Sequence, residues 1–250
     1  MELSLPLSAS HFRVSAGVRS LVSAWLMLLA ATVGWDLLGL DMAVMLHIGT
    51  PTGFPLQDNW WLSTVLHDKL RLVAQLLFVV MLVWASWPMR TGGLPRRERW
   101  LLVGLVVASL LVVNLIKLNS RTSCPWDLHA FGGDARYVSH WLLNVGDGGG
   151  GRCFPGGHAS SAFAFFALCL PWLCPPSGSQ RSRAPGWRWL FLVLTVGLVA
   201  GVTQTLRGAH HPSHTLWTLV ICMGISIVGW AIGQRWLQAR PQASAQAGKP

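Results

Sequence analysis

Three histidines, His210, His211 and His214, lie within five positions between two long apolar segments. Near pH 7 an imidazole can act as a nucleophile, a proton donor or acceptor, or a metal ligand, and it is costly in an apolar setting without such a role. We therefore expect the chemistry of the chain to be centred here. Because His210 and His214 also have a spacing that suits metal ligands on one helix face, a divalent-metal site formed by these three histidines with His67 and Asp68 is a competing hypothesis.

Two further stretches carry groups that bind anions. The sequence Pro155-Gly156-Gly157-His158 opens an apolar segment, and the N–H groups of a glycine-rich helix start favour an anion. Lys117 and Arg121 are four residues apart, which places both cations on one helix face, and Arg207 lies just before the histidine cluster. Phosphoryl transfer needs such a set of cations, N–H donors and histidines, because its catalysis is mostly positioning and charge stabilisation.

The composition indicates which elements position these residues. Hydrophobic residues make up 52% of the 250 residues, charged residues 11%, and the mean hydropathy is +0.46, values typical of a membrane protein. Apolar segments at about 21–40, 70–87, 100–116, 159–174, 189–206 and 216–236 predict six spans. The predicted fold class is therefore all-α: a polytopic bundle of six transmembrane helices in a single domain, residues 1–240, followed by a disordered tail at 241–250.

The distribution of charge predicts the orientation of this bundle. If the N-terminus is cytoplasmic, 12 of the 19 Lys and Arg residues fall on the inner side, in agreement with the positive-inside rule. Both termini are then cytoplasmic, and the histidine cluster lies at the periplasmic face of a bacterial inner membrane. The net charge of +10 is spread over short groups, so we expect no nucleic-acid partner. An amphipathic stretch from Trp60 to Asp68 predicts an interfacial helix. The oligomeric state stays open.

Cysteine placement predicts one disulfide. Cys124 and Cys153 are the two cysteines outside the apolar segments, and both belong to the long outer loop at about 122–157. In an oxidising compartment we expect them to pair and to hold this loop over the site. Cys169, Cys174 and Cys222 lie in apolar segments, where we expect them to fill space.

Three motifs carry a family resemblance. Lys117-x6-Cys124-Pro125, then Pro155-Gly156-Gly157-His158, then the stretch 208–214 resemble, in this order, the three signature motifs of the type 2 phosphatidic acid phosphatase superfamily. The resemblance implies that Lys117 binds phosphate, that His158 is the general acid for the leaving group, and that His210 is the nucleophile. It also implies that the residue four positions after His210, here His214, orients the nucleophile.

The chain departs from the family pattern at four positions. Cys124 stands in place of an Arg, Gly156 in place of a Ser, Gln204 in place of an Arg, and His214 in place of the orienting Asp. We expect Arg121 and Arg207 to replace the missing cations, with Gly156 and Gly157 adding N–H donors. A neutral His214 would accept a hydrogen bond from His210, and Asp127 and Asp134 are the candidates for a carboxylate that takes the orienting role instead. His211 is expected to face the substrate mouth or solvent.

The predicted function is hydrolysis of a lipid phosphomonoester or pyrophosphate in the outer leaflet, through a phosphohistidine at His210 and without a metal or cofactor. Three alternatives remain at this stage. The same intermediate would serve a lipid-to-lipid phosphotransferase. The histidines would serve a non-enzymatic protein that binds a divalent metal. The altered motifs are also compatible with an inactive membrane scaffold.

Overall fold

The computed structural model describes residues 16–88, 93–176 and 178–246, and within this part of the chain it contains no β-strand. The α-helices are α1 (Ala16–Leu37), α2 (Leu40–Ile48), α3 (Leu70–Ser86), α4 (Arg96–Asn119), α5 (Gly157–Phe163), α6 (Leu170–Leu173), α7 (Ala184–Leu206) and α8 (Pro212–Gln246). Segment η1 (Trp61–Lys69) is a π-helix, and the 3₁₀-helices are η2 (Pro125–Asp127), η3 (His129–Phe131) and η4 (Ala164–Cys169). The predicted all-α class is confirmed.

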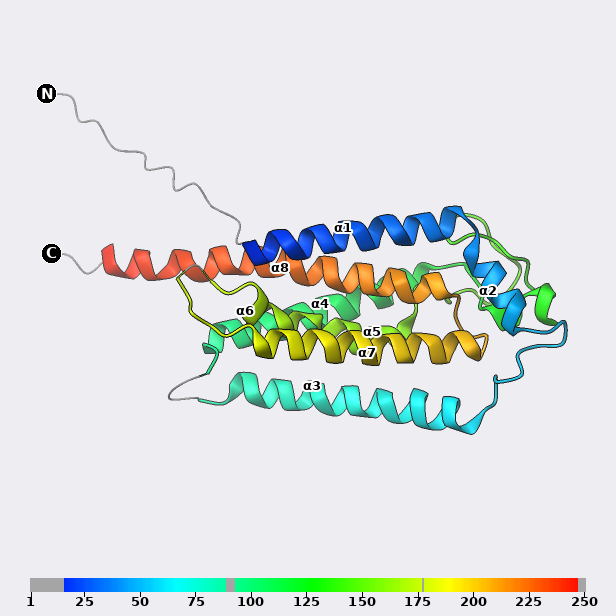
Figure 1. Ribbon diagram of the computed structural model, residues 1–250, viewed down its shortest axis with the longest axis horizontal. Coiled ribbons are helices and arrows are strands. Elements are labelled where there is room, and N and C mark those ends of the chain that lie inside the picture. The colour runs from blue at the N-terminus through cyan, green and yellow to red at the C-terminus, as the bar shows by residue number, and fades with distance from the viewer. Residues whose placement is uncertain (1–15, 89–92, 177, 247–250) are drawn as a thin grey trace, which may run out of the picture.

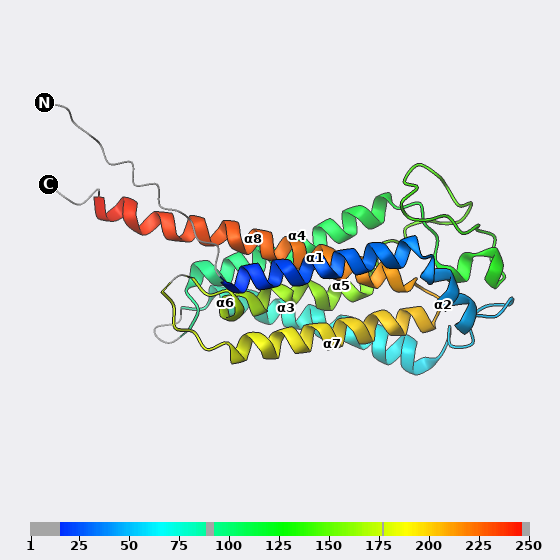
Figure 2. The ribbon, with the colours of Figure 1, turned by 45° about the horizontal axis from the view of Figure 1, so that its top comes forward.

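The long helices run side by side along the longest axis of the molecule (Figure 1). Helix α8 packs against α1, α4 and α5, while α7 packs against α5 and η4. The start of α1 and the end of α8 lie at the same end of the bundle, and α2 and the long loop after α4 lie at the opposite end (Figures 1 and 2). The chain therefore traverses the bundle in alternating directions.

Five helical segments are long and apolar enough to cross a membrane: Ala16–Leu37, Trp61–Ser86, Arg96–Asn119, Ala184–Leu206 and Pro212–Leu237. The chain is accordingly a multi-pass membrane protein. The segment Gly157–Leu173 is apolar but shorter. Its middle part, η4, is a 3₁₀-helix, which rises about 2.0 Å per residue instead of 1.5 Å and so lengthens the segment. That this segment forms a sixth span stays a prediction.

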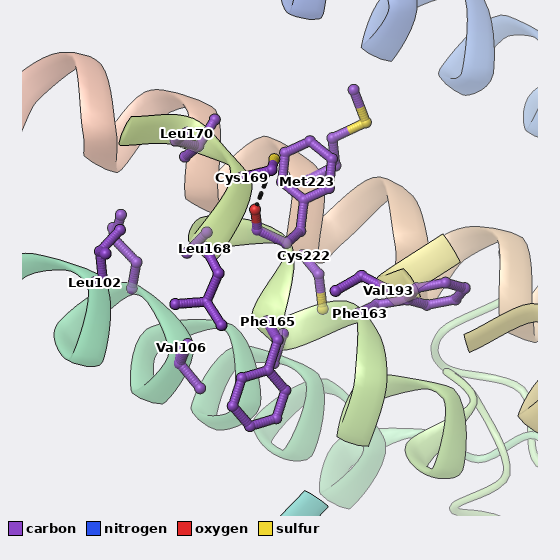
Figure 3. Packing of buried hydrophobic residues seen from close by; sticks show 14 of the residues in the cluster. Leu102, Val106, Phe163, Phe165, Leu168, Cys169, Leu170, Val193, Cys222 and Met223 are labelled. Carbon is purple, nitrogen blue, oxygen red and sulfur yellow. Dashed lines mark hydrogen bonds between the residues drawn. The ribbon is translucent and has the colours of Figure 1, made fainter. Parts of the chain in front are cut away.

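The short segment from α5 to α6 is the centre of the hydrophobic core. Its side chains pack against α4, α7 and α8, and Figure 3 shows Phe163, Phe165 and Leu168 among Val106 and Cys222 of the neighbouring helices. Every residue from Ala162 to Leu170 is buried. The other helices thus surround this segment with protein, and the free cysteines Cys169, Cys174 and Cys222 are buried, as expected for residues that fill space.

The outer segment between the first two spans differs from its prediction. Gly39, with φ of +63°, ends α1 and is followed directly by the short helix α2. The stretch Trp61–Lys69 is not a separate interfacial helix, because its helical backbone continues without a break into α3. The predicted helix is therefore present as the first part of a longer one, and its interfacial position stays a prediction.

The chain ends bear on two other predictions. Helix α8 continues through Gln246, so residues 241–246 of the tail predicted to be disordered are helical, and residues 247–250 lie outside the described residues. Residues 1–15 and 89–92, whose arginines count toward the predicted cytoplasmic charge, also lie outside them.

Candidate active site

Three residues far apart in sequence meet at the end of the bundle opposite the start of α1 and the end of α8 (Figure 1). Lys117 lies near the end of α4, His158 is the second residue of α5, and His210 lies in the turn between α7 and α8. The rings of His158 and His210 have centroids 6.1 Å apart. A Cβ added to Gly157 would lie 3.1 Å from Nζ of Lys117, so this ammonium group packs directly against the first residue of α5. One cation, one helix start and two imidazoles therefore share one site.

The turn that holds His210 depends on a glycine. Gly208 has φ of +74°, a conformation that favours glycine, and a Cβ there would lie 2.1 Å from Cδ2 of Phe54. The backbone carbonyl of Gln204 then accepts hydrogen bonds from the N–H groups of Ala209 and His210, at 2.9 and 3.3 Å. These bonds fix the backbone of His210 at the end of α7, and they give the carbonyl of Gln204 a structural role.

Neighbours of His210 leave one ring nitrogen for chemistry. Its Nδ1 lies 3.4 Å from Nδ1 of His214 and 3.3 Å from Sγ of Cys153. Cys153 is joined to Cys124 in the predicted disulfide, so its sulfur carries no hydrogen and the contact is packing. Because Nε2 lies on the far side of the ring from Nδ1, it is the nitrogen left to attack a phosphorus atom. Burial, and then the positive charge of Lys117, lower the pKa of His210 and keep the ring neutral.

His211 occupies a different place from the one predicted. It is 1% exposed, with Tyr137 against its ring at 5.6 Å and His214 at 5.1 Å, and neither ring nitrogen has a hydrogen-bond partner. Burial lowers the pKa of His211 to about 4. The prediction that it faces the substrate mouth or solvent is wrong, because α8 turns this residue inward beneath the outer loop.

A cavity of about 610 Å³ opens beside the site. At its polar end it is lined by Lys117, Gly157 and His158, together with His67 and Arg71 from the start of the second span. Apolar side chains complete the wall, among them Leu70, Phe78, Leu110 and Phe165. The cavity thus joins a cationic mouth to an apolar interior.

Sequence reasoning gave too little weight to His67 and Arg71. The ring centroid of His67 lies 4.0 Å from that of His158, and both residues line the cavity. Their spacing of four residues, which places two polar groups on one helix face, was the signal that could have identified them. The sequence-based hypotheses placed His67 in an interfacial helix or in a metal site and gave Arg71 no role.

The predicted phosphate-binding residues are not all brought together. The guanidinium of Arg121 donates to the backbone carbonyl of Asn144 at 3.2 Å, and Arg121 lines other cavities than the one beside Lys117. Arg207 donates through Nε to the carbonyl of Gln57 at 2.9 Å and remains within electrostatic reach of His158. The N–H of Gly156 is engaged by the carbonyl of His214 at 3.0 Å, so Gly157 begins the set of N–H groups that could meet an anion. Lys117 and Gly157 are the predicted binding residues at the cavity, with Arg207 nearby.

The competing metal site does not form from the predicted residues. In the described part of the chain, one group of three His, Cys, Asp or Glu residues has ligand atoms close enough to hold a metal ion: Cys124, Cys153 and His210. Both sulfurs of this group are in the disulfide, so neither is a thiolate ligand. His67 and Asp68 contact each other, at 2.7 Å, instead of joining His210 and His214.

Comparison with known families identifies the class of protein. The PAP2 superfamily matches residues 98–238, more than half of the chain. The chain belongs to the PAP2 superfamily. This membership indicates phosphatase activity on phosphate esters. No match is found among curated proteins or among solved structures. The PAP2 match includes Lys117, His158 and His210, whereas α1, α2, η1 and α3 lie outside it.

Proposed function

We propose that this PAP2 protein is a membrane phosphatase that hydrolyses a lipid phosphomonoester or pyrophosphate through a phosphohistidine on His210. The observation that carries the proposal is the meeting of Lys117, His158 and His210 from three separate elements: Lys117 and His158 line one cavity, and the buried ring of His210 lies 6.1 Å behind that of His158. A lysine ammonium, the N–H groups at a helix start and two imidazoles supply the positive charge and the hydrogen-bond donors that a phosphoryl group requires during its transfer.

In the proposed reaction, Nε2 of His210 attacks phosphorus while the bond to the leaving oxygen breaks. His158 gives its proton to that oxygen, and the anionic phosphate beside His158 favours the protonated ring beforehand. Water then attacks the phosphohistidine, His158 accepts the proton of the water, and phosphate leaves as the N–P bond breaks. Lys117, Arg207 and the first N–H groups of α5 balance the negative charge of the phosphoryl oxygens.

The substrate class follows from the rest of the cavity. Beyond the cationic mouth its walls are apolar, with Leu70, Phe78, Leu110 and Phe165. This lining supports a substrate whose phosphate lies at the mouth and whose hydrocarbon chain lies between α3 and the helices around α5. We propose that a single domain, residues 1–240, crosses a bacterial inner membrane six times, with Gly157–Leu173 as the sixth span, cytoplasmic termini and a periplasmic site.

The central test is phosphate release by the purified full-length chain. The substrates are an isoprenyl pyrophosphate, a phosphatidyl phosphate and lipid A, and the variants are His210→Ala and, as a matched control, His47→Ala, which removes an exposed histidine of α2. We expect His210→Ala to reduce release to background and His47→Ala to retain it. Equal release by His210→Ala and the wild type would overturn the proposal. Labelled phosphate recovered in an acceptor lipid would identify a phosphotransferase instead.

The role of His158 is tested through the leaving group. His158→Asn is expected to lower kcat/KM, which reports the steps through departure of the leaving group, about 10²- to 10⁴-fold for an alkyl phosphate, the usual contribution of a general acid. The loss should be much smaller for 4-nitrophenyl phosphate, because that leaving group departs without a proton. An equal loss on both substrates would show that His158 is not the acid.

A further inference from the structure

The residue that should orient His210 is not a carboxylate in this chain. His214 occupies that position, and its Nδ1 lies 3.4 Å from Nδ1 of His210. A neutral imidazole can accept the N–H of His210, but it brings no negative charge to balance the cationic ring that forms on phosphorylation. A carboxylate that serves this purpose must therefore come from elsewhere.

The two acids suggested by the sequence are not near His214. The carboxylate of Asp127 accepts a hydrogen bond from the N–H of Cys124 at 3.3 Å and caps the short helix η2. For Asp134, no side-chain contact with His210 or His214 is found in the described part of the chain. Neither acid faces the nucleophile.

A different acid, Asp36 at the end of α1, lies at the other end of a line of imidazole rings. Its side chain is 5% exposed, and Oδ2 accepts hydrogen bonds from Nε1 of Trp141 at 3.1 Å and of Trp217 at 2.8 Å. The same oxygen lies 3.2 Å from Nε2 of His140, without the alignment of a hydrogen bond, and both this nitrogen and Oδ1 are buried without a hydrogen-bond partner. Two indole N–H groups therefore hold this carboxylate in place.

His140 and His214 bridge the distance between this carboxylate and the nucleophile. The ring centroids of His140 and His214 are 6.0 Å apart, close to the 5.7 Å between those of His214 and His210. Nε2 of His214 is buried and has no hydrogen-bond partner, and Phe154 stacks on His140 at 4.1 Å and holds its ring in place. Burial lowers the pKa of His140, and the negative charges of Asp36 and Asp41 oppose that effect.

We propose that Asp36 is the carboxylate that orients and charge-balances His210, acting through His140 and His214. The three imidazole N–H groups are then directed the same way: from Nδ1 of His210 to Nδ1 of His214, which is the one hydrogen bond already formed, from Nε2 of His214 toward His140, and from Nε2 of His140 toward Oδ2 of Asp36. Asp36 is a positioning residue, because it does not touch the substrate. The inference rests on the proposed function and adds α1, which lies outside the PAP2 match, to the active site.

The second buried acid at this end of the bundle has a different task. Asp41 accepts hydrogen bonds from Nε1 of Trp35 at 2.9 Å and from the backbone N–H of Ser213 at 2.9 Å, and also from the hydroxyl of Ser213. These partners make Asp41 a cap for the first turn of α8. It holds the helix that carries His214, without a direct contact to the line of rings.

The test combines each variant with a carboxylate restored at position 214. Asp36→Asn and His140→Phe are made in the wild type and in His214→Asp, and kinetics are measured on the lipid that the substrate panel identifies. In the wild-type background we expect kcat to fall about 10- to 100-fold with KM little changed, less than the roughly 10⁴-fold loss that follows removal of a directly bonded carboxylate. In the His214→Asp background both losses should shrink to about threefold or less, because the new carboxylate reaches His210 directly.

Asp41→Asn is the matched control, since it neutralises a buried acid of the same bundle end. Any loss it causes should be the same in both backgrounds. His140→Phe leaves the hydrogen bonds from Trp141 and Trp217 to Asp36 intact. It therefore tests the connection between Asp36 and His214 even where Asp36→Asn lowers the yield of folded protein.

Several results would overturn the inference. One is full activity of both Asp36→Asn and His140→Phe, and another is an equal loss in both backgrounds, which is what a purely structural clamp between α1 and α8 would give. An inactive His214→Asp also counts against it. A wild-type protein that releases no phosphate from any lipid would instead reject the proposed function itself.

Discussion

At the scale of single residues, burial favours the neutral form of His210, the proposed nucleophile. His210 is 4% exposed, and burial, then Lys117 and His158, lower its pKa below the ordinary histidine value of 6.5. A histidine attacks as the neutral ring, and a depressed pKa keeps that ring neutral in weakly acidic solution. The pH range of activity is therefore a property of this one environment.

We expect the acid limb of kcat/KM, where His210 takes up a proton, to be centred below pH 6.5. The measurement is the pH profile of kcat/KM for the wild type, which reports groups of the free enzyme. The same profile for the control variant His47→Ala should superimpose on it. An acid limb centred at or above pH 6.5 would contradict the prediction.

At the scale of elements, close contact of α7 with its neighbours sets the width of the bundle. Gly197 of α7 faces the ring of Phe163, and Gly201 faces Thr215 at the start of α8. Small residues at such positions let helix backbones approach closely in a membrane protein. Because α5 and α8 carry His158 and His214, this contact also positions the site.

Gly197→Ala should lower the free energy of unfolding by about 1–3 kcal/mol, the usual cost of overfilling a packed core. A Cβ there would lie 2.0 Å from Cε1 of Phe163, whose side chain is fully buried and has little room to move. Unfolding of the purified protein in mixed micelles measures the change. Gly104→Ala in α4 is the matched control, since a Cβ there meets nothing within 4 Å. Equal stability of the two variants would show that this contact is not tight.

At the scale of the whole molecule, the disulfide joins the outer loop to the reaction centre. Cys124 and Cys153 are separated by 29 residues, and Sγ of Cys153 lies 3.3 Å from Nδ1 of His210. Backbone bonds from Arg152 to Ser120 and from Cys153 to Thr122 hold the two ends of this loop together. The loop also carries His140, so its position affects more than one member of the site.

Replacing both Cys124 and Cys153 by Ser should lower stability by roughly 2–4 kcal/mol, the usual effect of a disulfide that closes a loop of this length. We also expect lower phosphate release, because the wall beside His210 becomes mobile. A reductant should affect the wild type in the same direction and leave the double variant unchanged. Cys222→Ala, which removes a buried free thiol, should keep the response of the wild type to the reductant. A reductant effect of equal size on the double variant would contradict the assignment.

Local pattern in the sequence was sufficient for the helices and for the three residues at the centre of the site. Apolar segments predict spans because a helix needs about 20 consecutive apolar residues to cross the hydrocarbon core of a bilayer. Five helices in the described residues are long and apolar enough to do so. Lys117, His158 and His210 each stand at the outer end of such a segment, so an alternating bundle brings them together whatever its details. The same reasoning predicted the Cys124–Cys153 disulfide.

Tertiary structure decided the surroundings of that centre. Arg121 turns toward the carbonyl of Asn144, the N–H of Gly156 is taken by His214, and His211 is buried, because each outcome depends on which backbone passes nearby. Asp36 is 181 residues from Trp217 and still accepts its indole N–H. Spacing along the chain determines which residues share one face of a helix. Contacts between helices depend on tertiary packing, which the local sequence pattern does not encode.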